Sequence, residues 1–308
     1  MALPDHTLLS LDDAAFAAHF ERRPFKIAHQ LATHPLLQLP RLVQYARSLD
    51  RPILYFRGDH AINQVDAESA GRGMRRTFID RQLAQPALAA PEVLEQIQSC
   101  GAWMHLRDVG TDPAYAALLA QLMEELRDPA QRMAPGISGP RADIFVSSPG
   151  AITPFHLDEE HNFLLQIRGS KTLHIADGSN PAVLDRASLR SFFAGNGELA
   201  PYSEHLERHA MRVELFPGEG VHIPACHPHW VRNGGEVSIS LGLLWYSDGT
   251  ARRRFLYRVN RWMERCGLEP AAPSVHPTID AIKTFPVTVR RRFRRWCQRH
   301  QSGVASQL

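Results

Sequence analysis

Short strand-like segments separated by turn residues fill residues 143–246, and this run limits the possible folds more than any other feature of the chain. The segments combine apolar and polar residues with a period of two, and Gly, Pro, Asn or Asp lies between them. They read DIFVSS, TPFHLD, FLLQIRG, KTLHIAD, MRVELF, GVHIP and EVSISLGLLW. Many short strands of this kind are typical of a double-stranded β-helix, or jelly roll. We therefore predict a mainly β protein with a jelly-roll core and helical additions.

The sequence on either side of this run predicts mixed α/β elements before it and helices after it. We expect helices at 10–20, 41–49, 91–99 and 112–126, strands at 53–57 and 103–109, and an irregular linker at 128–140, which holds three prolines and two glycines. We divide the chain into three segments. Residues 1–140 are helices and flanking strands that support the barrel, residues 141–250 are the barrel itself, and residues 251–308 are a basic helical extension.

Two residues of metal-binding type stand two positions apart in the second segment of the run, His156 and Asp158. On a strand, positions i and i+2 project from the same face, so the imidazole and the carboxylate can converge on one ion. A non-haem Fe(II) site needs two histidines and one carboxylate on one face, which leaves other coordination positions open. The second histidine must come from elsewhere, and the later segment PGEGVHIPACHPHW offers three histidines. A loop before the next strand carries two of them, His227 and His229.

Lys171 begins a strand whose alternate residues, Leu173 and Ile175, are apolar. It shares their face, so its ammonium group should be desolvated unless an anion meets it. Only three of the 35 Lys and Arg residues are lysines (Lys26, Lys171 and Lys283). A compact ammonium suits a narrow anion site better than a planar guanidinium does. We therefore expect Lys171 to bind an anionic ligand.

Together these residues resemble the Jumonji-C branch of the cupin-like 2-oxoglutarate oxygenases, in particular the factor-inhibiting-HIF-like hydroxylases. In that family the distal histidine lies five residues after an Ile-Pro pair, which here selects His229 over His227. The family lysine lies fifteen residues after the first histidine, where this chain has Lys171. The resemblance is good over residues 141–246 and looser over 25–42 and 103–119.

The resemblance also implies roles for residues around the metal. It makes His156, Asp158 and His229 the Fe(II) ligands, and it pairs the distal carboxylate of 2-oxoglutarate with Lys171 and Thr153. By the same comparison Asn162 lies beside the proximal carboxylate. The sequence departs from the family at two places. Gly242 stands where related hydroxylases have a second asparagine, and the early-strand tyrosine has no clear equivalent in AWMHLR, residues 102–107.

The implied activity is that of an Fe(II)- and 2-oxoglutarate-dependent oxygenase that hydroxylates a side chain of a protein or peptide. A small-molecule metabolite is the alternative substrate. Two other classes compete with this prediction. One is a cupin-like binding or regulatory protein without turnover, and the other is a metal cupin that does not use 2-oxoglutarate.

Cysteine spacing and hydropathy bear on the compartment. The four cysteines are widely spaced, with no C-x-x-C pair, and no apolar stretch has the length of a signal peptide or a transmembrane segment. We therefore expect a cytoplasmic protein. The C-terminal run VRRRFRRWCQRH holds six arginines at positions 290–299, which favours an anionic partner. The helices of this extension also predict a homodimer.

Overall fold

The computed structural model describes residues 7–49, 54–57, 90–194 and 204–285. Within these, residues up to 250 belong to one compact unit and residues from 251 onward to another, so each unit is described by itself. The basic run at 290–299 lies outside the described residues. No helix in the described ranges combines the length and the apolarity that crossing a membrane requires.

The described elements alternate between short helices and strands at first and are mostly strands from residue 138. The helices are α1 (Asp13–His19), η1 (Pro35–Leu37), α2 (Leu39–Arg47), α4 (Ala90–Glu95), η2 (Val109–Thr111), α5 (Pro113–Met133), α6 (Arg186–Phe193), α7 (Glu204–Glu207) and α8 (Asp248–Arg265). The strands are β1 (Leu9–Ser10), β2 (Phe25–His29), β3 (Leu54–Arg57), β4 (Ala102–Leu106), β5 (Ser138–Ser147), β6 (Ile152–His156), β7 (His161–Arg168), β8 (Lys171–Ala176), β9 (Ala210–Leu215), β10 (Glu219–Ile223), β11 (His229–Asn233) and β12 (Ser238–Tyr246).

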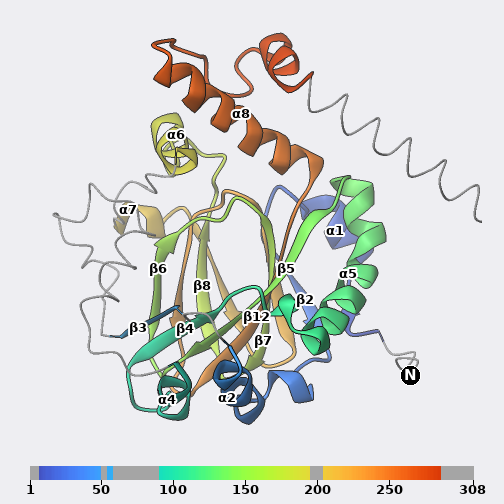
Figure 1. Ribbon diagram of the computed structural model, residues 1–308, viewed down its shortest axis with the longest axis vertical. Coiled ribbons are helices and arrows are strands. Elements are labelled where there is room, and N and C mark those ends of the chain that lie inside the picture. Colours follow the sequence, from blue (N-terminus) through green and yellow to red (C-terminus); the bar gives the residue numbers. More distant parts are fainter. Residues whose placement is uncertain (1–6, 50–53, 58–89, 195–203, 286–308) are drawn as a thin grey trace, which may run out of the picture. The chain divides into compact units, whose positions relative to one another are not determined.

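Two antiparallel sheets form the core of the first unit (Figure 1). The large sheet has the order β1-β2-β10-β7-β12-β5-β4-β3, and the small sheet has the order β6-β11-β8-β9. Strands β5 to β12 pair as nested hairpins, β8 with β9, β7 with β10, β6 with β11 and β5 with β12. This nesting defines a double-stranded β-helix, so the predicted jelly roll is confirmed.

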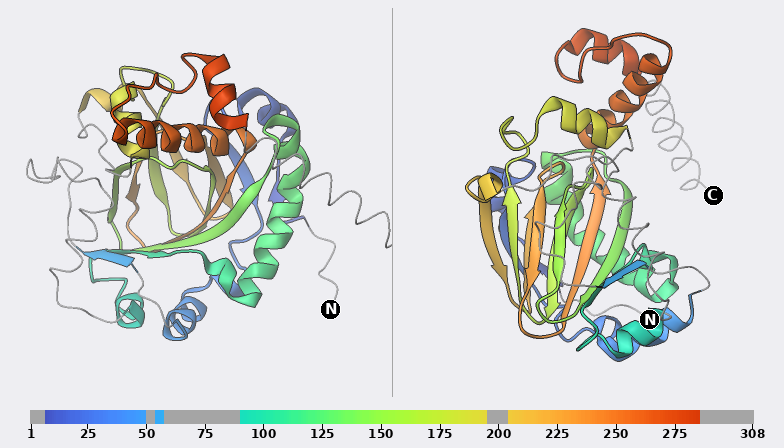
Figure 2. Two further views of the ribbon diagram at one scale, coloured as in Figure 1. Left: turned by 45° about the horizontal axis from the view of Figure 1, so that its top comes forward. Right: turned by 90° about the vertical axis from the view of Figure 1, so that its left-hand side faces the viewer.

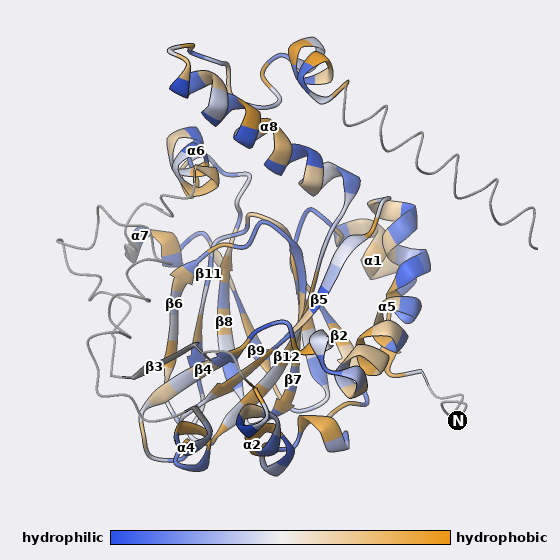
Figure 3. Ribbon diagram, in the orientation of Figure 1, coloured by the Kyte–Doolittle hydropathy of each residue, from blue (hydrophilic) through white to orange (hydrophobic). Residues whose placement is uncertain are grey.

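Alternation along the strands separates an outer face of the large sheet from an inner one. On β5, Ala142, Ile144 and Val146 are buried in the core that includes residues of α1, α2 and α5. The residues between them, including Asp143 and Phe145, face the other way. A second apolar cluster takes residues from both sheets and lies between them. Figures 2 and 3 show α5 along the outside of the large sheet, with polar and apolar residues on different sides of the helix.

α5 corrects the prediction of an irregular linker at residues 128–140. The helix continues through Pro129 to Met133, and β5 begins at Ser138. A proline inside a helix removes one backbone hydrogen bond and costs about 3 kcal/mol. Here Leu126, Pro129 and Ala130 are all buried, and packing of this apolar side offsets that cost. The division of the chain at residue 140 stays a prediction.

The C-terminal unit contains most of α8 and a second helical segment at 277–285. Asn260 links the two helical segments, because its amide donates to the carbonyl of Ala271 (2.8 Å) and its Oδ1 accepts from Lys283 Nζ (2.7 Å). Trp262 of α8 is 66% exposed.

His222 of β10 is fully buried in an aromatic cluster on the helix-covered side of the large sheet. Its ring centroid lies 4.6, 5.1 and 5.0 Å from those of Phe20, Phe25 and Phe163. Neither ring nitrogen has a hydrogen-bond partner among the described residues. Burial lowers the pKa of His222 well below its ordinary value, nearby histidines lower it further, and a backbone contact offsets part of this. His222 is therefore neutral in the folded protein.

Acid should consequently destabilise the fold through His222. Below the unfolded-state pKa of about 6.5, the unfolded chain binds a proton here that the folded chain does not, so the free energy of unfolding falls by about 1.4 kcal/mol per pH unit. Urea unfolding curves recorded at several pH values below 6.5 measure this dependence, and in His222→Phe the free energy of unfolding should no longer contain the contribution of about 1.4 kcal/mol per pH unit. Phe163→Leu disturbs the same cluster without removing a titrating group, so it should lower stability at every pH and keep the slope. Equal slopes for wild type and His222→Phe would contradict this account.

Candidate active site

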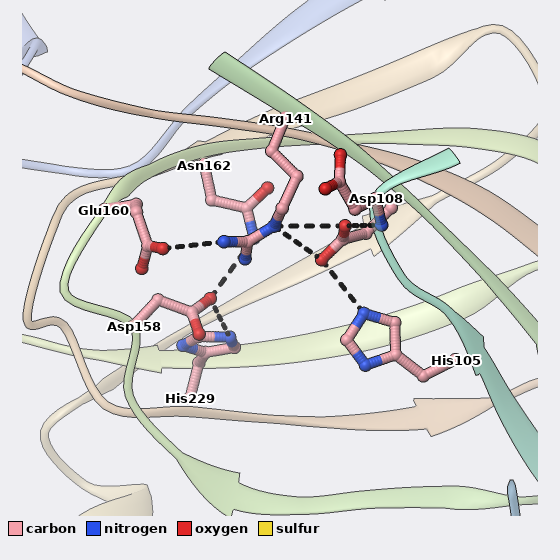
Figure 4. Close-up of polar contacts among 8 residues, drawn as sticks. His105, Asp108, Arg141, Asp158, Glu160, Asn162 and His229 are labelled. Atoms are coloured by element: carbon pink, nitrogen blue, oxygen red, sulfur yellow. Dashed lines mark hydrogen bonds and ion pairs between the residues drawn. The ribbon is translucent and has the colours of Figure 1, made fainter. Parts of the chain in front are cut away.

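The structure brings together one carboxylate and two imidazoles from distant parts of the chain, Asp158, His156 and His229. One ligand atom from each side chain lies within 4.8 Å of the others. His156 ends β6 and His229 begins β11, and the two residues are direct partners across these strands. Their ring centroids are 4.1 Å apart. His229 Nε2 lies 3.9 Å from Asp158 Oδ2, and Figure 4 shows the two side chains next to each other.

Asp158 reaches the group from a loop, not from the strand that the i, i+2 argument assumed. β6 ends at His156, so alternation along a strand does not aim this carboxylate. Its backbone carbonyl accepts a hydrogen bond of 2.7 Å from the amide of Cys226, in the segment that leads to His229. A long contact of 3.4 Å joins Asn162 Nδ2 to Asp158 Oδ2. The prediction that His156 and Asp158 converge holds, but its physical reason is different.

Both imidazoles have Nδ1 engaged and Nε2 directed to the group. His156 Nδ1 lies 2.7 Å from the carbonyl oxygen of Pro154, and His229 Nδ1 lies 2.9 Å from that of His227. A ring nitrogen that faces a carbonyl oxygen must carry the proton, so Nε2 keeps its lone pair. Burial and the charge of His156 lower the pKa of His229 to about 4, against the opposing effect of Asp158. His229 is therefore a neutral donor at ordinary pH.

The second candidate histidine, His227, is buried outside this group. Its Nε2 lies 3.6 Å from Asp177 Oδ1, and the cluster of potential ligand atoms contains His229 instead. The geometry thus favours the same histidine as the family resemblance. Two imidazoles and one carboxylate on one side are the donor set of non-haem Fe(II) sites, so the residues present fit this ion.

Lys171 is 5% exposed and faces the interior between the sheets, as its alternation predicts. Leu173, two residues after Lys171 on β8, pairs with Val231 of β11. On the other side of β11, Val231 pairs with Thr153 of β6. Lys171 and Thr153 therefore share the inner face of the small sheet with His229. Burial lowers the pKa of Lys171 to about 7, and no charged or hydrogen-bonding group of the described residues opposes this effect. A buried ammonium of this kind calls for an anion.

Asn162 projects from β7 next to Asp158 of the candidate metal-binding group, which consists of His156, Asp158 and His229. It is buried, and its Oδ1 has no hydrogen-bond partner within the described ranges. A Cβ added to Gly242 would lie 3.5 Å from this oxygen and 3.2 Å from Phe145. Phe145, Leu244 and Asn162 thus already occupy the space around Gly242, and a side chain at this position would require Phe145 to move. On β4 the residues between its buried ones are Trp103 and His105, so this strand offers no tyrosine.

Charged residues that the sequence analysis missed surround Asp158 on the side of the large sheet. Arg141 Nε lies 3.1 Å from both oxygens of Asp143, and its Nη1 lies 2.9 Å from Glu160 Oε1 (Figure 4). His105 Nε2 lies 2.9 Å from Asp143 Oδ2. Arg141 and Asp143 alternate on β5, and a charged pair on the inward face of a central strand was the signal available in the sequence.

The chain is similar to known proteins both in sequence pattern and in fold. Residues 110–251 match the family model of the cupin-like domain. The chain is similar to the structure of YcfD, a ribosomal oxygenase from Escherichia coli, in complex with cobalt and 2-oxoglutarate. The identity is 15% and the TM-score 0.50, and the match covers 88% of this chain but only 62% of that one. YcfD in complex with cobalt and succinic acid is 14% identical with a TM-score of 0.50, covering 92% of this chain and 68% of that one. At these identities the likeness is one of fold.

A comparison with curated protein sequences gave no match. The family model covers β5 to β12, which pair as nested hairpins, and it includes His156, Asp158 and His229, the three residues that could hold a metal ion. Residues 110–251 therefore match a cupin-like domain and have the fold expected of one.

Proposed function

We propose that this protein is an Fe(II)- and 2-oxoglutarate-dependent oxygenase that hydroxylates a side chain of a protein or peptide. The observation that carries the proposal is the convergence of His156, Asp158 and His229 within 4.8 Å. The buried Lys171 on the same interior supports the choice of an anionic co-substrate. A metal site alone is compatible with many cupin activities, whereas a desolvated lysine beside it favours a keto-diacid.

Each residue of the site has a defined task in this proposal. His156 and His229 present Nε2 to the metal, because carbonyl oxygens hold their Nδ1–H groups. Asp158 supplies the anionic ligand. Lys171 and Thr153 bind the distal carboxylate of 2-oxoglutarate from the inner face of the small sheet. Asn162 lies at the other end of the co-substrate, beside its proximal carboxylate.

The distance between the two ends of the site agrees with this arrangement. Ile175 on β8 is the direct partner of His229, and Lys171 lies four residues before it. Four strand residues span about 13 Å at about 3.3 Å per residue. The extended lysine side chain covers part of that distance and leaves room for a five-carbon diacid. When bound, Fe(II) would activate oxygen, and the chain's own residues orient the co-substrate and exclude water.

The substrate class rests on the fold relatives. The similar structures include a ribosomal oxygenase recorded with 2-oxoglutarate and with succinic acid. By analogy with these structures, we propose that the substrate of this chain is a protein or a peptide. The cytoplasmic location expected from the cysteine spacing stays a prediction.

The test is oxygen-dependent conversion of 2-oxoglutarate to succinate by the full chain. With Fe(II), oxygen and ascorbate we expect succinate to form slowly without substrate and faster with peptides that become 16 Da heavier. Omitting Fe(II) or oxygen should stop the reaction. If the protein binds no divalent metal, the oxygenase proposal is wrong. If it binds metal and oxidises a substrate without consuming 2-oxoglutarate, the chain is another type of metal cupin.

We further propose a homodimer through the C-terminal helices. The segment 277–285 exposes Ile279, Ile282 and Phe285, each three residues from the next and therefore on one side of the helix. Analytical ultracentrifugation should find a dimer that Ile282→Glu weakens. The anionic partner predicted for residues 290–299 is not addressed by the described residues and stays a prediction.

A further inference from the structure

The metal ligand Asp158 lies in a four-residue connection, 157–160, between β6 and β7. Strand pairing does not hold such a connection, so other contacts must set the position of the carboxylate. At one end, Leu157 is buried in the apolar cluster on the outer side of the small sheet. At the other end, Glu160 is 7% exposed and bound by Arg141.

Arg141 connects this loop to the large sheet. Its guanidinium group donates from Nε to both oxygens of Asp143, at 3.1 Å, and from Nη1 to Glu160 Oε1, at 2.9 Å. Figure 4 shows this group beside Glu160 and Asp158. A guanidinium has donors at fixed angles and can hold two carboxylates in a set geometry, which a lysine ammonium cannot do.

The anchor on the large sheet is itself well fixed. Asp143 is 1% exposed, and its oxygens also accept from the backbone amide of Asp108 (2.7 Å) and contact His105 Nε2 (2.9 Å). Burial alone would raise the pKa of Asp143, but His105, Arg141 and the Asp108 amide together lower it below its ordinary value. Asp143 is therefore ionised, and it holds Arg141 charged and in place.

We propose that Arg141 is a positioning residue for the metal site. Through Glu160 it holds the 157–160 loop in the conformation that directs the carboxylate of Asp158 at the imidazoles of His156 and His229. Metal affinity then depends on a side chain that does not touch the metal. The inference rests on the metal binding assigned under the proposed function, and it adds a determinant that the family resemblance does not supply.

The positive charge of Arg141 by itself predicts the opposite effect on metal affinity when Arg141 is replaced with a neutral residue. A positive charge near a cation site opposes cation binding, so removing the Arg141 charge should tighten metal binding if Arg141 acts only through its field. If Arg141 acts by holding the loop, the same substitution should weaken binding, because Asp158 loses its fixed direction and Glu160 loses its partner. Arg141→Gln therefore separates the two mechanisms by the sign of its effect.

The experiment is a titration of the full-length apoprotein with Co(II), followed by calorimetry and by the visible absorption bands of the bound ion. We expect Arg141→Gln and Arg141→Lys to raise the dissociation constant for Co(II) by about 10- to 100-fold, the range found when groups that orient metal ligands are removed. The absorption bands should also change, since the carboxylate no longer coordinates in the same geometry. Arg127→Lys alters the exposed pair of Arg127 with Glu124 and serves as the matched control, with no change in either measurement.

Glu160→Gln provides a second route, since it preserves the shape of the side chain and is less disruptive to folding. It should also weaken Co(II) binding, because a neutral amide oxygen accepts more weakly from Arg141 than a carboxylate does, and its effect should not add to that of Arg141→Lys because both weaken the same contact. Unchanged affinity and spectrum in folded Arg141→Lys and Glu160→Gln variants, or tighter binding by Arg141→Gln, overturn the proposal while leaving the oxygenase assignment intact. Failure of the wild-type protein to bind Co(II) overturns both.

Discussion

Replacing Asp158 with alanine should reduce Fe(II)-dependent turnover of 2-oxoglutarate to the level measured without metal. The substitution removes the only carboxylate of the metal-binding group and leaves two imidazoles. Changing groups that merely orient a ligand costs 10- to 100-fold, so losing a ligand should cost more than about 100-fold. His156→Ala and His229→Ala should have the same effect, measured as succinate formed per protein.

His227→Ala is the matched control for this series. His227 is a buried histidine two residues from His229, and its contact with His229 is made by its backbone carbonyl, which alanine retains. Turnover should therefore stay within a few-fold of wild type, provided that circular dichroism finds the variant folded. Turnover that survives in Asp158→Ala and His156→Ala but disappears in His227→Ala would show that the metal site has been assigned to the wrong residues.

Replacing Lys171 with methionine should raise the KM for 2-oxoglutarate by about 100-fold, equivalent to about 2.8 kcal/mol. Methionine preserves most of the apolar side chain and removes the ammonium, so the co-substrate carboxylate would be buried without a counter-charge. The exposed Lys26, which pairs with Glu219, offers the control, and Lys26→Met should leave the KM within two-fold. A KM that Lys171→Met does not alter would favour a cupin that uses no 2-oxoglutarate.

The pH dependence of this KM tests the same residue independently. The pKa of Lys171 is lowered to about 7 in the protein without ligand, and a bound carboxylate raises it again. Above pH 7 the free protein holds a neutral lysine, so binding must take up a proton. The KM for 2-oxoglutarate should therefore rise with pH, by about tenfold per unit while the complex stays protonated. The rise should disappear in Lys171→Met.

Several structural features were predictable because they depend on local spacing. Alternation of apolar residues placed Lys171 on the inner face of its strand, and the same rule located the strands of the jelly roll. The end of α5 was not predictable in this way. Pro129 and the glycines after it predict a break, and only contact with the large sheet shows that the helix continues to Met133.

What the sequence determined by itself was the set of chemical groups and, for a strand residue such as Lys171, the face on which it lies, because a period of two is a property of neighbouring residues. The tertiary structure alone decided which groups meet. His229 joins His156 because β11 pairs with β6 in one register, and that register depends on contacts between segments about 70 residues apart. The loop position of Asp158 and its link through Glu160 to Arg141 were decided in the same way. No local pattern encodes a distance across two sheets, since packing of the whole core sets it.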